Sequence, residues 1–182
     1  MSYDQYKYRS KTSPREKLKR VIWNFVWLLA FRPTPRWALS KWRVGLLKLF
    51  GAKIGAGCLV SPKCKIWAPW NLEMGELVCL ADDVDCYCVD KIIIGSKVAV
   101  SQRAFLCTAS HEIETYHREL IHAPISIEDH VWVCAEAFVG PGITIEHSAV
   151  IAARAVVTRN VEAYAVVGGN PARLLKQRTV TS

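Results

Sequence analysis

His111 is the side chain of this sequence with the clearest capacity for acid–base chemistry, and it lies in the run Ser110-His111-Glu112. Imidazole titrates close to neutral pH, so it can take a proton from a hydroxyl and give it up again. The run leads into residues 112–126, which interrupt an otherwise regular pattern. Such insertions often carry function, and a base at their root is held in place by the scaffold. A lone loop histidine would more often have no chemical role.

Two further histidines close to this run could take part in metal chemistry. His117 and His122 lie further along the insertion, and with His111 they could supply a zinc site. Such a site needs three convergent ligands and an open position, and a flexible loop would have to gather two of them. No metal is therefore expected. Asp82 and Asp83 are expected to lie on a solvated turn.

The scaffold that must position these groups repeats every six residues. An aliphatic residue returns at each sixth position, and the fifth position of each unit is small or apolar; the aliphatic set is Ile127, Val133, Val139, Ile145, Ile151 and Val157. A helix has no such period, and a plain strand alternates every second residue. The period is typical of a solenoid of short strands, a parallel β-helix. A β-sandwich fits less well, because its strands vary in length.

The same phase is predicted upstream, from Ile54 through Leu72 and Val78 to Val84 without a gap. Four extra residues, placed at 90–93, then precede a further set from Ile94 to Leu106. Trp70 is too large for a tight inward corner, so it is expected to mark a distorted coil or a docking surface.

The charge of the chain is concentrated near its N-terminus. Residues 1–65 hold fifteen Lys/Arg and two acids, a balance of +13, whereas the whole chain has a net charge of +8. This asymmetry favours an anionic partner, such as a phospholipid headgroup or a pyrophosphate-linked substrate. Nucleic acid is not expected, because no nucleic-acid module is recognisable.

The seven cysteines follow neither zinc nor disulfide spacing. Three of them, Cys58, Cys64 and Cys88, are expected on small inward positions of their hexads. Buried free thiols fit the reducing cytoplasm.

The N-terminal region is rich in tryptophan as well as in positive charge. The apolar run Val21–Phe31 is shorter than the roughly 20 residues needed to span a bilayer. Trp37–Phe50 has helical spacing with a basic opposite side. Two interpretations remain open: an interfacial helix pair with tryptophans at headgroup depth, or a cap packed on the solenoid. Residues 1–14 are expected to form a mobile arm, and no cleavable signal peptide is recognised.

Several short motifs, in order along most of the chain, carry a resemblance to a known family. They are Phe50-Gly-Ala-Lys-Ile-Gly, Pro69-Trp-Asn-Leu, Val84-Asp-Cys-Tyr, Ser101-Gln-Arg-Ala-Phe-Leu-Cys-Thr, Ser110-His-Glu, Val131-Trp, Pro141-Gly-Ile-Thr-Ile, Val156-Val-Thr-Arg-Asn and Gly169-Asn-Pro-Ala-Arg. From Arg20 to Arg173 the sequence resembles the hexapeptide-repeat O-acetyltransferases, in particular the colanic-acid-type exopolysaccharide enzymes and the maltose and galactoside group.

The resemblance implies a left-handed parallel β-helix with three strands per coil, and fifteen hexads would then make about five coils. The expected division is an N-terminal helical segment (1–53), a β-helix domain (54–167) with inserted loop 112–126, and a C-terminal cap (168–182). The family also implies a homotrimer with sites between subunits.

By the same resemblance, His111 would be the general base for acetyl transfer from acetyl-CoA to a sugar hydroxyl. Residues expected along acetyl-CoA are Trp132, Ala135 and Ala153 beside the pantetheine arm, and Thr158, Arg159 and Arg173 at the nucleotide end. Asp85 and Tyr87 would contact the acceptor. The acceptor would be a cell-surface or exopolysaccharide precursor, modified in the cytoplasm, with peripheral contact at the inner face of the membrane. The alternatives are an amino-sugar or nucleotide-sugar N-acetyltransferase and a non-catalytic trimeric scaffold.

Overall fold

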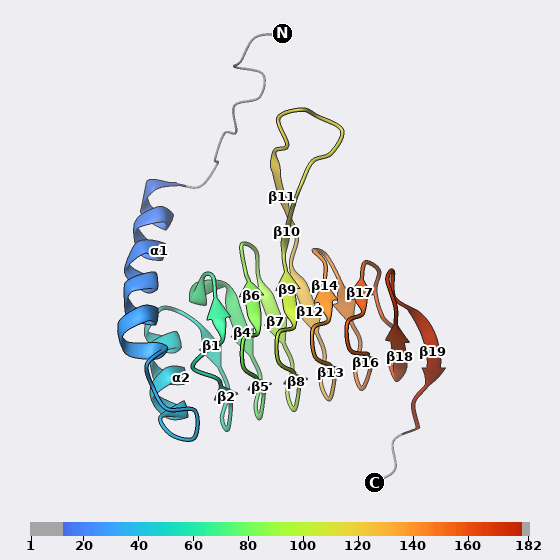
Figure 1. Cartoon of the computed structure of the whole chain (residues 1–182), viewed down its shortest axis with the longest axis horizontal. Coiled ribbons are helices and arrows are strands. Elements are labelled where there is room, and N and C mark those ends of the chain that lie inside the picture. Colours follow the sequence, from blue (N-terminus) through green and yellow to red (C-terminus); the bar gives the residue numbers. More distant parts are fainter. Residues whose placement is uncertain (1–12, 180–182) are drawn as a thin grey trace.

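The computed structural model describes residues 13–179, and these form a parallel β-solenoid with helices at one end (Figure 1). Its strands build three faces. Face A contains β1 (Lys53–Ile54), β4 (Leu72–Met74), β7 (Ile92–Ile94), β12 (Ile125–Ile127) and β15 (Thr144–Ile145). Face B contains β2 (Leu59–Val60), β5 (Cys79–Leu80), β8 (Ala99–Val100), β13 (Trp132–Val133), β16 (Val150–Ile151) and β18 (Ala165–Gly168). Face C contains β3 (Lys65–Ile66), β6 (Asp85–Tyr87), β9 (Phe105–Cys107), β14 (Phe138–Val139) and β17 (Val156–Val157).

The hexad pattern therefore predicted the architecture, and the solenoid is slightly longer than the expected five coils. Faces A and C each have five parallel strands among the described residues, and β18 gives face B a sixth. The aliphatic residues at the sixth positions of the last two coils point into the core, as in Val133 and Ile151, which pair across face B and are both fully buried.

The predicted register is wrong between Leu72 and Val84. Ile54 pairs with Met74, and Met74 pairs with Ile94, so partners in the first coils are 20 residues apart rather than 18. Two insertions of two residues replace the predicted insertion of four at 90–93. The cause is that each side of a coil buries two residues two positions apart, such as Val100 in β8 and Val98 just before it. A two-residue insertion moves the aliphatic set from one buried position to the other, so the sequence pattern looks unbroken.

All the insertions lie at one edge of the solenoid, where the chain passes from face C to face A. We call this edge the expanded corner; it comprises residues 67–71, 88–91 and 108–124 in successive coils. The largest insertion is a hairpin of β10 (Ala109–His111) and β11 (Leu120–His122), which projects from the body (Figure 1). Solenoid strand β12 already begins at Ile125, so the insertion ends earlier than the predicted residue 126.

Polar side chains hold the stacked loops of the expanded corner together. Asn71 Nδ2 donates to the carbonyls of Cys88 (3.1 Å) and Val89 (2.9 Å) in the next coil. Thr108 is fully buried, and its hydroxyl donates to Tyr87 O at 2.8 Å while accepting from Asp90 N–H at 2.9 Å. The expected distortion at Trp70 is present as a single 3₁₀ turn, η3 (Pro69–Asn71).

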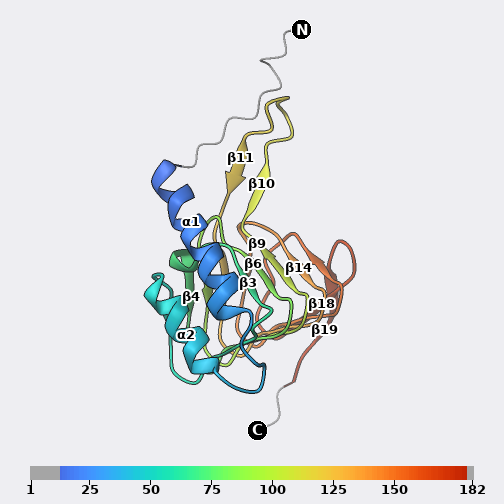
Figure 2. The same ribbon diagram turned by 60° about the vertical axis from the view of Figure 1, so that its left-hand side comes forward.

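Two helices cap the first coil (Figure 2). Helix α1 (Pro14–Val26) begins with a capping box between Ser13 and Glu16, and continues into the π-helical turn η2 (Trp27–Phe31). Trp23 on α1 is buried, and its indole N–H donates to Ile66 O at 2.7 Å. Helix α2 (Ser40–Leu49) follows the linker and buries Leu47. The cap interpretation of this region is therefore correct for its inner side. Residues 1–12 of the predicted arm lie outside the described residues.

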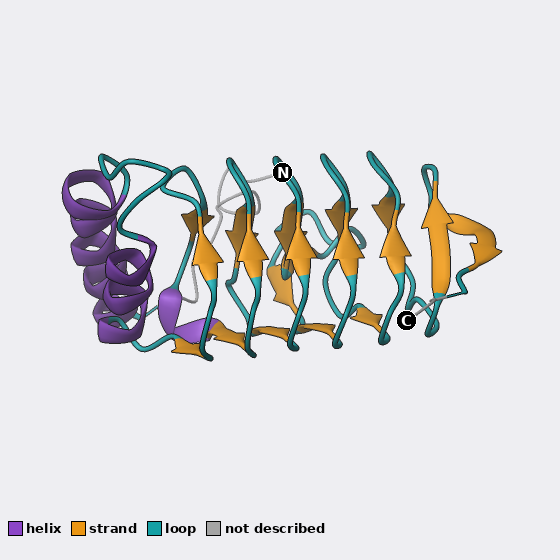
Figure 3. Cartoon of the chain, turned by 90° about the horizontal axis from the view of Figure 1, so that it is seen from below, coloured by secondary structure: helices purple, strands orange, loops and turns teal. Residues whose placement is uncertain are grey.

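The opposite end of the solenoid is closed by β19 (Arg173–Gln177), which turns back antiparallel to β18 (Figure 3). No helix among residues 13–179 is long and apolar enough to cross a membrane.

Candidate functional site

His111 is exposed on β10, and a backbone contact determines which ring nitrogen carries its proton. Its Nδ1 lies 2.7 Å from the carbonyl oxygen of Arg118 in the same hairpin. A carbonyl oxygen can only accept, so Nδ1 must carry the hydrogen. The neutral ring then has its lone pair on Nε2, which is the tautomer that a general base needs.

The positions of the hairpin histidines differ from the sequence-based expectation. His122, not His111, is at the root, since it pairs with Ala109 where the hairpin leaves the solenoid. His122 Nδ1 lies 2.7 Å from Asp90 Oδ2. Burial by itself would raise the pKa of Asp90, but the hydrogen bonds from His122 and from the backbone N–H of Lys91, together with the positive charges of these two residues, lower it overall. Sequence reasoning missed Asp90, because it lies in the expanded corner where the assumed register was wrong.

Asp85 and Tyr87 lie together on β6 and line a pocket between face C and the N-terminal helices. We call this the acceptor pocket; its lining residues are Asn24, Trp27, Lys65, Ile66, Trp67, Asp85 and Tyr87. The rings of Trp67 and Tyr87 are 4.7 Å apart. Burial raises the pKa of Asp85, and the nearby Lys65 opposes that effect. The hydroxyl of Thr108, the residue just before the hairpin, donates to the carbonyl of Tyr87. This hydrogen bond connects the pocket strand β6 to the base of the hairpin.

Trp132 lies on face B, half exposed, and its indole N–H donates to Ser101 Oγ at 2.9 Å. Ala135 follows in the next turn, and its carbonyl accepts from the backbone N–H of Arg154 at 2.9 Å, in the coil that also carries the exposed Ala153. Ala135 and Ala153 therefore lie in stacked turns at one edge of the solenoid, just beyond the face B strand that carries Trp132. Trp132 has an exposed ring, as a contact with a thread-like ligand requires.

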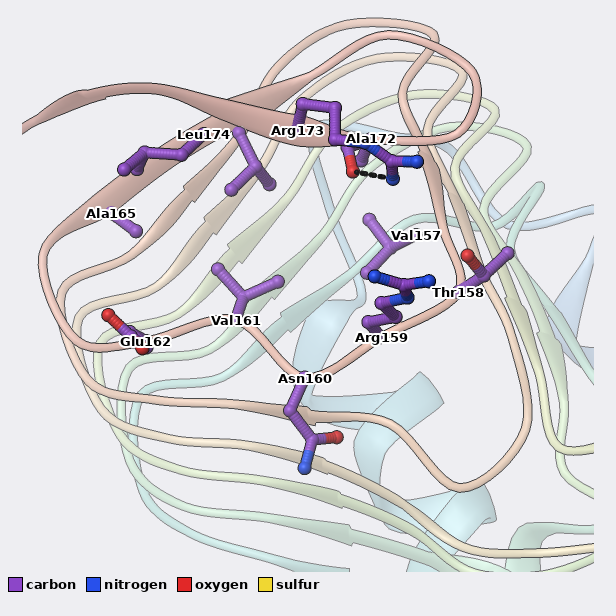
Figure 4. A pocket seen from close by; sticks show the side chains of 11 residues that line it. Val157, Thr158, Arg159, Asn160, Val161, Glu162, Ala165, Ala172, Arg173 and Leu174 are labelled. Carbon is purple, nitrogen blue, oxygen red and sulfur yellow. Dashed lines mark hydrogen bonds between the residues drawn. The ribbon is translucent and has the colours of Figure 1, made fainter.

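Thr158, Arg159 and Arg173 come together at the C-terminal end of the solenoid, where they line one pocket (Figure 4). The guanidinium groups of the two arginines lie on the same side of this pocket, near Thr158. Arg173 Nη1 donates to Ala172 O at 3.1 Å, and within residues 13–179 neither arginine pairs with a carboxylate. Two guanidinium groups without carboxylate partners are suited to phosphate.

One chain does not bring all the predicted residues to one place. The hairpin that carries His111 projects from one side of the solenoid, whereas β13, with Trp132, lies on the opposite side (Figure 1). A site that uses both residues needs two chains. In the part of the chain that is described, no cluster of three or more His, Cys, Asp or Glu side chains could hold a metal ion.

A β-solenoid with a histidine-bearing hairpin and an arginine-lined pocket has the features of an acyltransferase, and comparison with known proteins supports this class. No family model matches the sequence. The chain is 37% identical over 164 residues to the "Putative colanic acid biosynthesis acetyltransferase WcaF" of Escherichia coli K12, covering 90% of each chain. A maltose O-acetyltransferase from Clostridium difficile 630 has a TM-score of 0.80 and 26% identity over 92% of this chain and 90% of its own.

A hexapeptide-repeat acetyltransferase of Vibrio cholerae, solved with acetyl-CoA, has a TM-score of 0.84 and 24% identity, covering 96% of this chain and 95% of its own. The protein therefore belongs to the hexapeptide-repeat acetyltransferases and is an acyltransferase. The expected fold class, a left-handed parallel β-helix with an N-terminal helical segment, is confirmed.

Proposed function

We propose that the protein transfers the acetyl group of acetyl-CoA to a hydroxyl of a sugar in a cell-surface or exopolysaccharide precursor. The observation that carries the proposal is the hydrogen bond between His111 Nδ1 and Arg118 O, which leaves Nε2 as the basic nitrogen. The sugar hydroxyl gives its proton to Nε2 while its oxygen attacks the thioester carbonyl. The tetrahedral intermediate then collapses, the ester forms, and the CoA thiolate leaves and takes the proton from the imidazolium.

The donor and acceptor have separate sites in this proposal. Arg159 and Arg173 bind the phosphates of acetyl-CoA, and Trp132 contacts the pantetheine arm. The acceptor binds beside Asp85 and Tyr87, close to the hairpin root. Trp132 and the hairpin lie on opposite sides of one solenoid, which supports a site shared between two chains. We propose that the working enzyme is a homotrimer, as the family resemblance implies, in which one chain supplies the base and a neighbour supplies the donor groove.

Turnover of His111→Ala tests the role of the histidine. We expect acetyl-CoA to bind this variant with unchanged affinity in calorimetric titration, while kcat falls by roughly 10²- to 10⁴-fold. His117→Ala, in the same hairpin, is the matched control and should retain wild-type kcat. Wild-type turnover by His111→Ala would remove the base assignment. Failure of the folded wild type to bind acetyl-CoA would remove the acetyltransfer reaction. Cleavage of the product by hydroxylamine under mild conditions distinguishes an O-acetyl ester from an N-acetyl amide.

The proposed place of action is the cytoplasmic face of a membrane. Helix α1 and the turn η2 bury Trp23 and Phe31 but leave a row of apolar side chains exposed on the outer side: Leu18, Val21, Ile22, Phe25, Leu28 and Leu29. Trp37, in the basic linker before α2, is 90% exposed. Apolar side chains beside Lys and Arg are suited to a lipid interface.

Sedimentation with phosphatidylglycerol vesicles, compared with phosphatidylcholine vesicles, tests the membrane contact. We expect binding to the anionic vesicles that weakens at high salt and is lost in Phe25→Ser/Leu29→Ser. Ile113→Ser, which changes an exposed residue of the hairpin, is the control. Equal recovery in the supernatant with and without vesicles would exclude this contact.

A further inference from the structure

A second cavity adjoins the acceptor pocket, and the two share Trp27 and Lys65. It is lined by Trp27, Arg32, Lys63, Lys65 and Asp83, and we call it the cationic pocket. Three of its five side chains carry positive charge, against one carboxylate. The two pockets follow one another along η2 and β3, so one ligand can extend from the first into the second.

The cations of this pocket are not neutralised in the way that other cations of the solenoid are. Lys53 and Lys91 both pair with Glu73, and Arg103 and Arg154 both pair with Glu136. Within residues 13–179, no carboxylate lies within ion-pair distance of Arg32, Lys63 or Lys65. The guanidinium of Arg32 lies 5.4 Å from the centre of the Trp27 ring, which keeps it beside the shared wall of the two pockets.

The acceptor pocket has different chemistry. Trp67 and Tyr87 offer aromatic surface, and Asp85 and Asn24 offer hydrogen-bonding groups. Aromatic rings with a few convergent polar groups suit the apolar faces and hydroxyls of a sugar ring. Lysine and arginine side chains that form no ion pair with a carboxylate suit phosphate oxygens.

We propose that the acceptor is a glycosyl phosphate or diphosphate, with its sugar in the acceptor pocket and its phosphate bound by Arg32, Lys63 and Lys65. This inference rests on the proposed acetyl transfer to a sugar and adds the chemical class of the acceptor. The same chemistry is present in a lipid-linked and in a nucleotide-linked sugar. The exposed apolar side chains of Leu28 and Leu29 lie on η2, the segment that also contributes Trp27 to both pockets.

The phosphate subsite can be tested without knowledge of the sugar. Inorganic pyrophosphate is titrated calorimetrically into the enzyme in saturating CoA, so that Arg159 and Arg173 are already occupied. We expect binding that weakens about tenfold in each of Lys63→Gln and Lys65→Gln and falls with added salt. Lys97→Gln removes an exposed lysine on a different turn and should bind pyrophosphate as the wild type does. Equal pyrophosphate binding in all four proteins would overturn the subsite.

Turnover distinguishes this inference from the proposed function itself. Free galactose, glucose, mannose and fucose are compared with their 1-phosphates and nucleotide diphosphate forms, and with polyprenyl diphosphate forms in detergent. A kcat/KM at least tenfold higher for phosphorylated acceptors, reduced in Lys63→Gln, supports the inference. Whichever of the nucleotide-linked and polyprenyl-linked sugars has the higher kcat/KM identifies the class of the natural acceptor. Equal kcat/KM for free and phosphorylated sugars would overturn it and leave acetyl transfer intact. Absence of acetyl-CoA binding would instead overturn the proposed function.

Discussion

Arg43 on α2 is 1% exposed and makes its hydrogen bonds to oxygens of uncharged groups. Its Nε donates to Val60 O at 2.6 Å, in the first coil. Its Nη1 donates to Thr34 Oγ1 (2.8 Å), Ala38 O (2.9 Å) and Pro35 O (3.2 Å), in the linker between the helices. One guanidinium therefore joins α2, the linker and the solenoid.

Replacing Arg43 by methionine keeps a long apolar stem and removes every donor. Each buried carbonyl left without a partner costs about 1–3 kcal/mol. Two effects reduce this loss. The linker carbonyls can turn towards water, and the variant no longer has to bury a charged guanidinium, a cost that is reflected in the lowered pKa of Arg43. We therefore expect a net loss of about 3 kcal/mol of unfolding free energy, with Val60 O as the main contributor. The unfolding free energy of Arg43→Lys should lie between those of the wild type and Arg43→Met, because an ammonium group does not reproduce the planar fork of the guanidinium.

Urea unfolding followed by tryptophan fluorescence, at one protein concentration for all variants, measures this loss. Lys41→Met changes an exposed cation on the same helix and should lie within about 0.5 kcal/mol of the wild type. Wild-type or higher stability of Arg43→Met would refute the reasoning. It would mean that the desolvation cost of the charge equals or exceeds what its hydrogen bonds contribute.

Three further predictions concern the solenoid and its pocket. Gly75→Ala would place a Cβ 2.8 Å from the carbonyl carbon of Gly95 and should cost about 1–3 kcal/mol in urea unfolding, whereas Gly45→Ala in α2 meets nothing within 4 Å and should stabilise by about 0.5–1 kcal/mol. Burial raises the pKa of Asp85, so the native state holds its proton to higher pH than the unfolded chain and stability falls as pH rises through that range. Asp85→Asn should thus gain thermal stability over the wild type at pH 7 but not at pH 3, and lose acceptor turnover; an equal difference at both pH values would contradict this. Burial raises the pKa of Cys88 to about 12, so a thiol-specific reagent at pH 8 should label the partly exposed Cys134 in the folded protein and Cys88 only in urea.

The six-residue period was sufficient to predict the solenoid, because a strand that must bury the same positions in every coil leaves a repeat that no helix or sandwich shares. The period did not determine the register. Each side of a coil buries one residue in its strand and another two positions earlier, so Val78 and Val84 fitted the aliphatic set although they occupy the earlier of the two buried positions. Only pairing with neighbouring coils distinguishes the two, and pairing is a tertiary property.

The candidate site divides in the same way. Residue types and motif order, through the family resemblance, were enough to propose His111, Trp132 and the arginines of the C-terminal pocket as candidates. The tertiary structure decided how the candidate residues are grouped. Insertions that are separate in the sequence stack at one edge of the solenoid, where Thr108 forms a hydrogen bond with Tyr87 of the acceptor-pocket strand just before the hairpin begins. The Arg118 carbonyl that orients His111 is likewise brought into place by the turn of the hairpin. A sequence records which groups are present, whereas their distances depend on how successive coils are stacked.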